Sequence, residues 1–559
     1  MAGQNQPILV LSEDTERSKG KDAQKKNIEA AKAIADTVDT TLGPKGMDKM
    51  LVDSLGDVTI TNDGVTMLKE MDIEHPAAKM VIEVAETQDD ECGDGTTSAV
   101  ILAGELLSRS EELIDKGIHP SIIAKGYRLA VNEALKILNE LEHPVDIGDE
   151  DSLKNIAMTA MTGKSIEMDK EDLADIVVEA VKHIAEKEDG EYSADIDDIK
   201  VVKKAGASVN KTKMIDGVIL DKDRPHEGLP QGIDDAKIAL INSPLEVKET
   251  EIDTEVKITD TNQVQQFLDE EEKNIREMVE KLEDVGANVL LCQKGIDDLA
   301  QHHLAKKGIF ALRRVKKSDM KKLSKATGAN IITNIDDITE EDLGEAGQVE
   351  EKTVVDEKMT FIEGLEGKEA ASLLLRGGTD HVVEEVDRAL HDALKVVGVA
   401  IEDGSILPGG GASIVELSRR LKDYAGKVEG RKQLAVETFA EALNVIPRKL
   451  AENAGLDGID ILMELNTAHE KEGKADHGIN LETEEVEDMI EEKVIEPLRV
   501  KKQALQSATE LTDMVLLIDD IVASKGGEEG EQPPGPGGAP PGGPAGMPGG
   551  GGGLPPGLG

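Results

Sequence analysis

Apolar residues recur at helical spacing in the first part of the chain. Between residues 22 and 41, the apolar Ile28, Ala31, Ala35 and Val38 share one side of a helix with a period of 3.6 residues. Similar spacing predicts a helix over residues 76–90 and another long helix through residues 100–114. We therefore expect residues 21–150 to be mostly helical.

Alternation and short apolar runs predict the strands. Residues 58–61 alternate Val or Ile with Thr and lead into the turn Asn62-Asp63-Gly64. Later, strand-like segments at 288–292, 309–312 and 330–333 alternate with helical segments at 297–306 and 318–327. This order is a βαβ pattern, which predicts a parallel sheet.

The order of these patterns indicates the domain organisation. Helical spacing returns from Asp380 and continues towards the C-terminus, so a helical region brackets a mixed α/β middle. The middle is predicted to be inserted into the helical domain, with hinge segments at both crossings. Residues 249–275 form a charged, partly helical insertion. Residues 525–559 contain 25 Gly or Pro, cannot pack a core, and are predicted to be disordered.

Composition narrows the class of protein. At about 150 residues per domain, 559 residues correspond to three or four domains. The net charge of −50 repels nucleic acid and anionic membranes, and it fits a salty cytoplasm in which low salt would weaken subunit contacts. Cys92 and Cys292 form no disulfide framework, which favours a reducing, intracellular setting. No apolar run is long enough to span a membrane, and residues 1–20 lack a signal-peptide core.

The most informative motif is Gly93-Asp94-Gly95-Thr96-Thr97, which stands where an apolar helix begins. Backbone amides at a helix start attract phosphate oxygens, and glycines let the backbone approach a ligand. A single carboxylate suits Mg²⁺, which prefers one or two carboxylates together with substrate phosphates. The motif therefore predicts a magnesium-nucleotide site, although Gly-Asp-Gly turns are common and a plain helix cap remains the alternative.

Four further motifs occur with it in a fixed order. They are Thr41-Leu42-Gly43-Pro44-Lys45-Gly46, Asn62-Asp63-Gly64, His391-Asp392-Ala393-Leu394 and Pro408-Gly409-Gly410-Gly411. In this order and spacing the set resembles the chaperonins, over about residues 15–524. Met161-Thr162-Gly163-Lys164 and the insertion at 249–275 resemble the group II branch, which is archaeal and eukaryotic-cytosolic, and within it the archaeal thermosome subunits.

The resemblance implies a three-domain chaperonin fold. It assigns residues 1–150 and 404–524 to a mostly helical equatorial ATPase domain, and residues 151–222 and 372–403 to an intermediate hinge domain of mixed α/β structure. Residues 223–371 would form an α/β apical domain that holds substrate, with a helical lid protrusion at about 249–275. Subunits would form two stacked rings.

The resemblance also assigns roles near the phosphates. Asp94 would bind Mg²⁺, and Gly95, Thr96, Thr97 and Ser98 would contact the phosphates. Leu42, Gly43 and Pro44 would pack against the nucleotide, although Gly-Pro alone is only a turn signal.

Hydrolysis would depend on two carboxylates and a lysine. Asp63 would lie near the γ-phosphate and the attacking water, although Asp is common in such turns for local hydrogen-bonding reasons. Asp392 would position and polarise that water; the alternative is a solvated helix face with an i,i+4 pair to Arg388. Lys164 would sense the γ-phosphate, or else be an ordinary surface lysine. Hinge closure would bring Asp392 to Asp63 and Asp94.

The remaining nucleotide contacts lie late in the chain. Gly409 and Gly410 match glycines that let the backbone approach the ribose and base. Glu496 and Asn480 match neighbouring polar contacts, although Glu-Pro is also a usual helix start.

The function predicted from this resemblance is an ATP-dependent chaperone that encloses unfolded proteins in a double ring with a built-in lid. It implies ATP and Mg²⁺, with K⁺, as cofactors. The partners would be identical or sister subunits and unfolded clients in the cytoplasm, without a separate co-chaperonin, nucleic acid or membrane. The alternative is a structural or holdase ring with little ATPase cycling. A P-loop enzyme or kinase is disfavoured, because its motifs are missing.

Overall fold

The computed structural model describes residues 15–524 except 53–55, 57, 165–168, 247–260, 366–369 and 472. The chain divides into two compact units, one made of residues 1–19 with 520–559 and the other of residues 20–519. In the first unit, strand β1 (Thr15–Lys19) pairs antiparallel with β20 (Asp520–Ser524). The Gly/Pro-rich tail and the first part of the expected lid, residues 249–260, lie outside the described residues.

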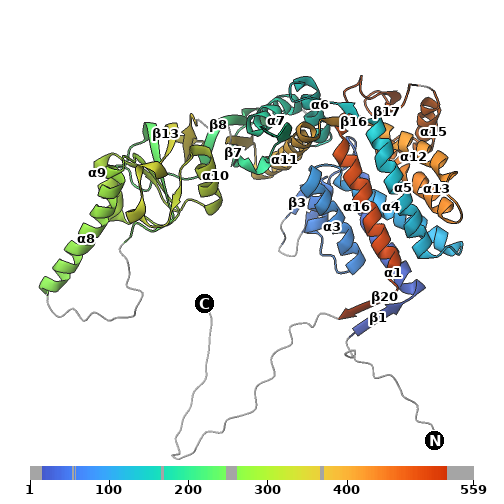
Figure 1. Cartoon of the computed structure of the whole chain (residues 1–559), viewed down its shortest axis with the longest axis horizontal. Helices are drawn as coiled ribbons and strands as arrows, with labels where there is room; N and C mark the ends of the chain where they lie inside the picture. The colour runs from blue at the N-terminus through green and yellow to red at the C-terminus, as the bar shows by residue number, and fades with distance from the viewer. Residues whose placement is uncertain are drawn as a thin grey trace, which may run out of the picture. The chain divides into compact units, whose positions relative to one another are not determined.

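A helical bundle forms one part of the second unit. Helix α4 (Thr96–Asp115) packs against α1 (Lys21–Val38), α3 (Pro76–Cys92) and α16 (Leu498–Leu517), while α5 (Pro120–Leu141) packs on α16 (Figure 1). The predicted helices over residues 22–41, 76–90 and 100–114 are therefore found. Close packing explains Gly104, because a Cβ there would lie 2.3 Å from Cβ of Ala35. Ala, Val, Ile and Leu make most of this core.

Shorter elements complete this part of the molecule. Its other helices are α2 (Gly64–Glu70), α12 (Ala412–Ala425), α13 (Lys432–Leu443), α14 (Val445–Asn453) and α15 (Gly458–His469), with a 3-10 turn at Asp39–Thr41. Its strands are β2 (Lys49–Val52) paired with β3 (Val58–Thr61), β17 (His477–Asn480) paired with β18 (Glu485–Asp488), and β16 (Ser405–Pro408) between β19 (Ile495–Pro497) and β4 (His143–Pro144).

A second hydrophobic core surrounds helix α11. This helix (Asp380–Asp403) packs against α6 (Glu150–Met161), α7 (Lys170–Ile184) and strands β7 (Ile199–Ala205) and β15 (Ala371–Gly377). The small hairpin β5 (Glu186–Glu188) and β6 (Glu191–Ser193) lies in the same region of the chain. The helix expected to begin at Asp380 does so, because the side chain of Thr379 caps it by accepting from the amide of Val382.

The middle of the chain contains a nine-stranded mixed sheet. The strand order is β11-β10-β9-β13-β14-β8-β15-β7, with β12 also paired to β9. The strands not yet given are β8 (Lys213–Leu220), β9 (Gly232–Ile241), β10 (Val289–Cys292), β11 (Phe310–Leu312), β12 (Ile331–Ile332), β13 (Gly344–Val354) and β14 (Glu357–Glu363). The predicted strands β10, β11 and β12 lie in a parallel part of the sheet together with β9, which was not predicted, whereas the β13–β14 hairpin and β8 continue the sheet antiparallel.

Helices cover both faces of the parallel part of this sheet. Ile238 and Leu240 of β9 face the core under α10 (Lys317–Thr327), whereas Ala239 and Ile241 face α8 (Thr261–Asp284) and α9 (Asp298–Lys307) (Figure 1). Burial on both faces explains why these strands read as unbroken apolar runs. The second part of the expected lid, residues 261–275, lies in α8.

Among the helices of the described residues, none is long and apolar enough to cross a membrane.

Candidate active site

The Gly93–Thr97 loop joins the end of α3 to the start of α4. Gly93 and Gly95 both have left-handed backbone conformations, with φ of +70° and +78°, and glycine adopts these without strain. The carboxylate of Asp94 accepts from the amide of Gly95 at 2.6 Å. In the described part of the chain, no side chain caps the start of α4, so its first amides are available to an anion.

Two side chains, the buried Gln88 and the half-buried Lys395, hold this loop in place. Gln88 donates from Nε2 to the carbonyl oxygens of Asp94, at 2.7 Å, and Val500, at 3.1 Å. Lys395 donates from Nζ to the carbonyl oxygens of Asp89 and Asp90, at 2.8 Å each. Neither Gln88 nor Lys395 was predicted to have a role, because neither belongs to a recognisable sequence motif.

The Asn62-Asp63-Gly64 turn lies directly against the start of α4. A Cβ at Gly64 would lie 2.7 Å from Oγ1 of Thr97. Asp63 caps helix α2, with one carboxylate oxygen accepting from the amide of Thr66 at 2.8 Å. Asp63 therefore makes the expected local hydrogen bond. The same turn also lies against the Gly93–Thr97 loop.

The Thr162-Gly163-Lys164 segment, which follows α6 in the hydrophobic core around α11, contacts the Asn62 turn and Pro44. Asn62 donates from Nδ2 to the carbonyl oxygen of Gly163 at 2.8 Å. A Cβ at Gly163 would lie 2.7 Å from Cα of Pro44. Lys164 donates from Nζ to the carboxylate of Asp392, and their side chains are only 13% and 15% exposed. The surface-lysine alternative for Lys164 is therefore wrong.

The solvated-face alternative for Asp392 is also wrong. Arg388 pairs with Glu385, at 2.5 Å, instead of with Asp392. Burial raises the pKa of Asp392 to about 8; Lys164 opposes this shift, and the negative charges of Asp63 and Asp94 add to it. The same two carboxylates, with Asp392, raise the pKa of Lys164 against the effect of burial. Asp63 and Asp94 therefore both lie within electrostatic range of Asp392 in this structure.

The Leu42-Gly43-Pro44 loop is fixed from the C-terminal half of the bundle. Asn453 donates from Nδ2 to the carbonyl oxygen of Leu42 at 2.9 Å. Gly43 has a φ of +82°, and a Cβ there would lie 2.4 Å from Cδ2 of Leu450. Since Pro44 also touches Gly163, the loop lies beside the Lys164 segment.

The late-chain residues form the other end of the site. Gly409 donates its amide to the carbonyl oxygen of Val494 at 2.8 Å, and Gly410 accepts from the amide of Ile479 at 2.9 Å. Glu496 lies on β19 and pairs with Lys501 at 3.0 Å. Burial raises the pKa of Glu496; Lys501 opposes this, and Asp94 adds to it. This coupling brings Glu496 within electrostatic range of the Asp94 loop.

Asn480 is placed at the end of β17 with its side chain engaged. Its Oδ1 accepts from the amide of Glu482 at 2.9 Å, and its Nδ2 donates to Glu487 at 2.7 Å. Asn480 therefore shapes the turn that follows β17.

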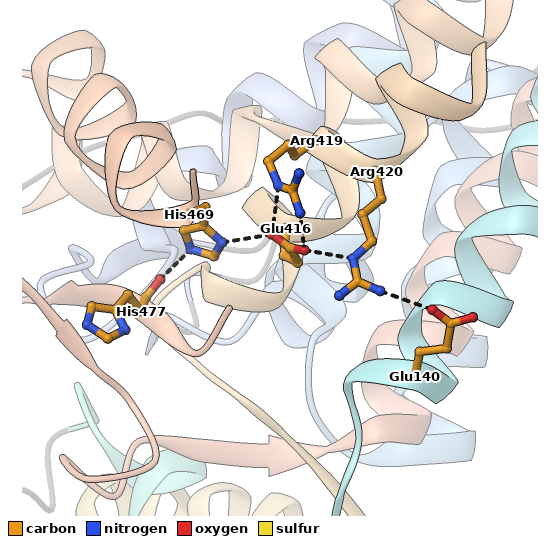
Figure 2. Close-up of polar contacts among 6 residues, drawn as sticks. All are labelled: Glu140, Glu416, Arg419, Arg420, His469 and His477. Carbon is orange, nitrogen blue, oxygen red and sulfur yellow. Dashed lines mark hydrogen bonds and ion pairs between the residues drawn. The ribbon is translucent and has the colours of Figure 1, made fainter. Parts of the chain in front are cut away.

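A charge cluster around the buried carboxylate of Glu416, next to the Gly409–Gly410 loop, was not expected from the sequence (Figure 2). Glu416, on α12, accepts hydrogen bonds from Arg419 and Arg420, and its carboxylate contacts His469. The spacing of Glu416 to Arg419 and Arg420 is a helical pairing signal, but it does not reveal burial or the contact with His469.

The chain is similar to known proteins over most of its length. Residues 34–526 match the model of the TCP-1/cpn60 chaperonin family. A thermosome subunit of Methanopyrus kandleri is 58% identical, over 94% of this chain and 96% of its own length. A thermosome subunit of Pyrococcus horikoshii is 59% identical, over 94% and 96%. The open-state monomer of a group II chaperonin from Methanococcoides burtonii matches with a TM-score of 0.60 and 49% identity, covering 76% of this chain and all of that one.

The chain therefore belongs to the TCP-1/cpn60 chaperonin family. It has the group II chaperonin fold and is an ATP-dependent molecular chaperone, whose ATP hydrolysis drives protein folding.

Proposed function

We propose that ATP binds between the start of α4 and the Gly409–Gly410 loop, and that it is hydrolysed there. The observation that carries this assignment is the convergence of Asp63, Asp94, Lys164 and Asp392, which come from four separate segments of the chain. Gly95, Thr96, Thr97 and Ser98 contact the phosphates, and Leu42, Gly43 and Pro44 cover the nucleotide. Gly409, Gly410, Asn480 and Glu496 form the ribose and base end.

Asp94 is the proposed magnesium ligand. In the described part of the chain, no group of three or more His, Cys, Asp or Glu side chains is arranged to hold a metal. One carboxylate beside available amides instead fits Mg²⁺, which shares its ligands between protein and substrate phosphates. When bound, Mg²⁺ neutralises the negative charge of the transferring phosphoryl group. K⁺ is proposed as a second ion from the family resemblance alone.

Asp392 and Asp63 orient the attacking water in this proposal. Phosphoryl transfer needs positioning and charge stabilisation more than covalent chemistry from the protein. Lys164 favours the ionised form of Asp392, since it is the cation that opposes the effect of burial on that carboxylate. A lysine is also a mobile point charge that can follow the γ-phosphate. Hydrolysis would then depend on the contact between the α6–Lys164 segment and α11.

We further propose the three-domain division and the ring assembly. The main hydrophobic cores, each of which lies mostly within one of the three parts, support the division into 1–150 with 404–524, 151–222 with 372–403, and 223–371. Relatives in Archaeoglobus fulgidus are named alpha and beta subunits, which supports rings of identical or sister chains. Residues 249–275 act as the built-in lid over unfolded clients, without a separate co-chaperonin. The proposed location is the cytoplasm.

The test is ATP turnover by the purified complex, with its rings viewed by electron microscopy. We expect closed double rings whose hydrolysis stops on chelation of Mg²⁺ and returns when Mg²⁺ is restored. Asp94→Asn should lower turnover by about 100-fold or more with rings intact, whereas Asp90→Asn, an exposed neighbour on α3, should not. Rings that suppress aggregation without ATP turnover would instead favour the holdase alternative.

A further inference from the structure

The carboxylate of Glu416 is buried one helical turn beyond the Gly409–Gly410 loop. It is 2% exposed. Arg419 donates to it at 2.6 and 3.0 Å, and Arg420 at 2.7 Å. Arg420 also donates to Glu140 of α5 at 3.0 Å, so the cluster ties α12 to α5 (Figure 2). Glu416 is thus a fixed anchor within the bundle.

His469, the last residue of α15, lies between this anchor and β17. Its ring is fully buried, with Nδ1 3.2 Å from Oε2 of Glu416 and Nε2 2.7 Å from the carbonyl oxygen of His477. A carbonyl oxygen only accepts hydrogen bonds, so Nε2 carries a proton and donates it. Figure 2 shows the ring spanning the two partners.

The strand that His469 holds lies directly on the glycine loop. The amide of Ile479 donates to the carbonyl oxygen of Gly410 at 2.9 Å. A Cβ at Gly478 would lie 2.7 Å from the carbonyl oxygen of Gly409 and 2.9 Å from that of Gly410. The backbone of residues 477–480 and the Gly409–Gly410 loop therefore have little freedom to move independently. His469 holds the first residue of this strand, His477, through its carbonyl oxygen.

We propose that His469 is a positioning residue for the adenosine end of the nucleotide. It acts through the carbonyl group of His477, which sets the place of Gly478–Asn480 against Gly409–Gly410. The inference rests on the proposed nucleotide site, in which this loop approaches the ribose and base. The phosphate end is held by different contacts, from Gln88 and Lys395 to the Asp94 loop. Loss of the His469 link should therefore weaken adenosine recognition and leave phosphate recognition intact.

Two amide substitutions separate the two hydrogen bonds of His469. In His469→Gln the amide nitrogen reaches the position of Nε2 and keeps the bond to His477. In His469→Asn it reaches only the position of Nδ1 and keeps the contact with Glu416. Both replace the ring by a neutral amide, so they are matched in polarity. His119→Gln is the control, since His119 is an exposed cap of α5 whose side chain, among the described residues, bonds to nearby Ser121.

The experiment uses assembled rings and measures the dissociation constant for ADP by calorimetry and for magnesium pyrophosphate by competition. For His469→Asn we expect about 10-fold weaker ADP binding, the loss of one good hydrogen bond, with pyrophosphate binding unchanged. KM for ATP should rise while kcat stays near the wild-type value. His469→Gln and His119→Gln should stay within about threefold of wild type for both ligands.

The outcomes distinguish this inference from the proposed function. Wild-type rings that bind neither ligand overturn the nucleotide site itself. If wild type binds ADP but His469→Asn binds it equally well, or loses both ligands equally, the positioning role is wrong. Equal losses in the Gln and Asn variants also overturn it, because then the link to His477 is not what matters.

Hydrogen exchange provides a second measurement that does not depend on the Asn variant assembling. In wild-type and His469→Gln rings, ADP should slow exchange of the Ile479 amide, whereas magnesium pyrophosphate should not. An Ile479 amide that exchanges at the same rate with and without ADP overturns the inference.

Discussion

Asp392 and Glu416 are both buried carboxylates in contact with cations, yet their pKa values move in opposite directions. Burial raises the pKa of Asp392 to about 8. Lys164 opposes this shift, but two further carboxylates, Asp63 and Asp94, add to it. Burial also acts to raise the pKa of Glu416, but hydrogen bonds from His469, Arg419 and Arg420 outweigh it and hold the pKa well below its ordinary value.

The difference follows from the balance of charge around each group. At Asp392 three carboxylates share Lys164, so the site holds excess negative charge that a bound cation would relieve. At Glu416 two arginines donate to one carboxylate that also contacts His469, so the cluster is satisfied by the protein alone. Unbalanced charge is typical of a functional site, whereas a charge fully paired within the protein is typical of a structural one.

Asp392→Ala should have the largest effect. We expect ATP turnover to fall by about 10³-fold, the usual range for loss of a group that acts on the attacking water, with nucleotide binding retained. Steady-state phosphate release and calorimetry measure the two. Asp387→Ala is the matched control on the same helix, where Asp387 pairs with Lys203 at 3.0 Å. Full turnover in Asp392→Ala would remove Asp392 from the mechanism.

Lys164→Met should lower turnover by about 10- to 100-fold. Without the ammonium group, Asp392 lies beside Asp63 and Asp94 with less compensation, so its ionised form is less populated. Single-turnover hydrolysis after ATP binding measures the effect. The control is Lys154→Met. Lys154 lies on α6, shortly before Lys164, and its ion pair with Asp175 is more exposed, so turnover should stay near the wild-type value. A Lys164→Met ring with unchanged single-turnover kinetics contradicts the assigned role.

Glu416→Gln should affect stability more than catalysis. The change leaves Arg419, Arg420 and His469 without their anionic partner, which costs about 2–4 kcal/mol of unfolding free energy. Denaturant unfolding at pH 7 measures it, and kcat of the folded rings should be retained. Glu140→Gln removes an exposed partner of Arg420 and should cost less than about 0.5 kcal/mol. Equal losses in the two variants would contradict the contrast between buried and exposed partners.

The stability gap between wild type and Glu416→Gln should depend on pH. Because the folded pKa of Glu416 is lowered from 4.5, its stabilising contribution is complete above that value and is lost as the pH falls towards the folded pKa. The gap should shrink by up to about 1.4 kcal/mol for each pH unit below 4.5. Denaturation midpoints of both proteins at pH 7, 4.5 and 3.5 check this, and a gap that widens on acidification contradicts it.

Much of the fold was predictable because local patterns agreed with the tertiary structure. The helices that became α1, α3, α4 and α11 had regular apolar spacing and clear starts. The parallel strands β10 and β11 read as short apolar runs because they are buried on both faces. The antiparallel half of the sheet was missed: β13, with its polar and charged positions, gave no contiguous apolar run.

The candidate site was predictable in its residues more than in its contacts. The glycine-rich motifs carry their signal locally, since Gly93 and Gly95 adopt backbone conformations that favour glycine. Gln88, Lys395 and His469 were missed because each acts on the backbone of another segment, and such bonds leave no fixed spacing in the sequence. The roles of the site residues, the domain boundaries and the lid stay predictions.

The family, the motif order and the residue types that can bind a magnesium nucleotide follow from the sequence alone, because these depend on short-range backbone and side-chain chemistry. Which charges meet depends on how the chain packs in three dimensions. This packing placed Lys164 against Asp392 and His469 between Glu416 and β17. Burial then gave two carboxylates of similar intrinsic acidity opposite pKa shifts, because a buried charge depends on every neighbour that the fold brings to it.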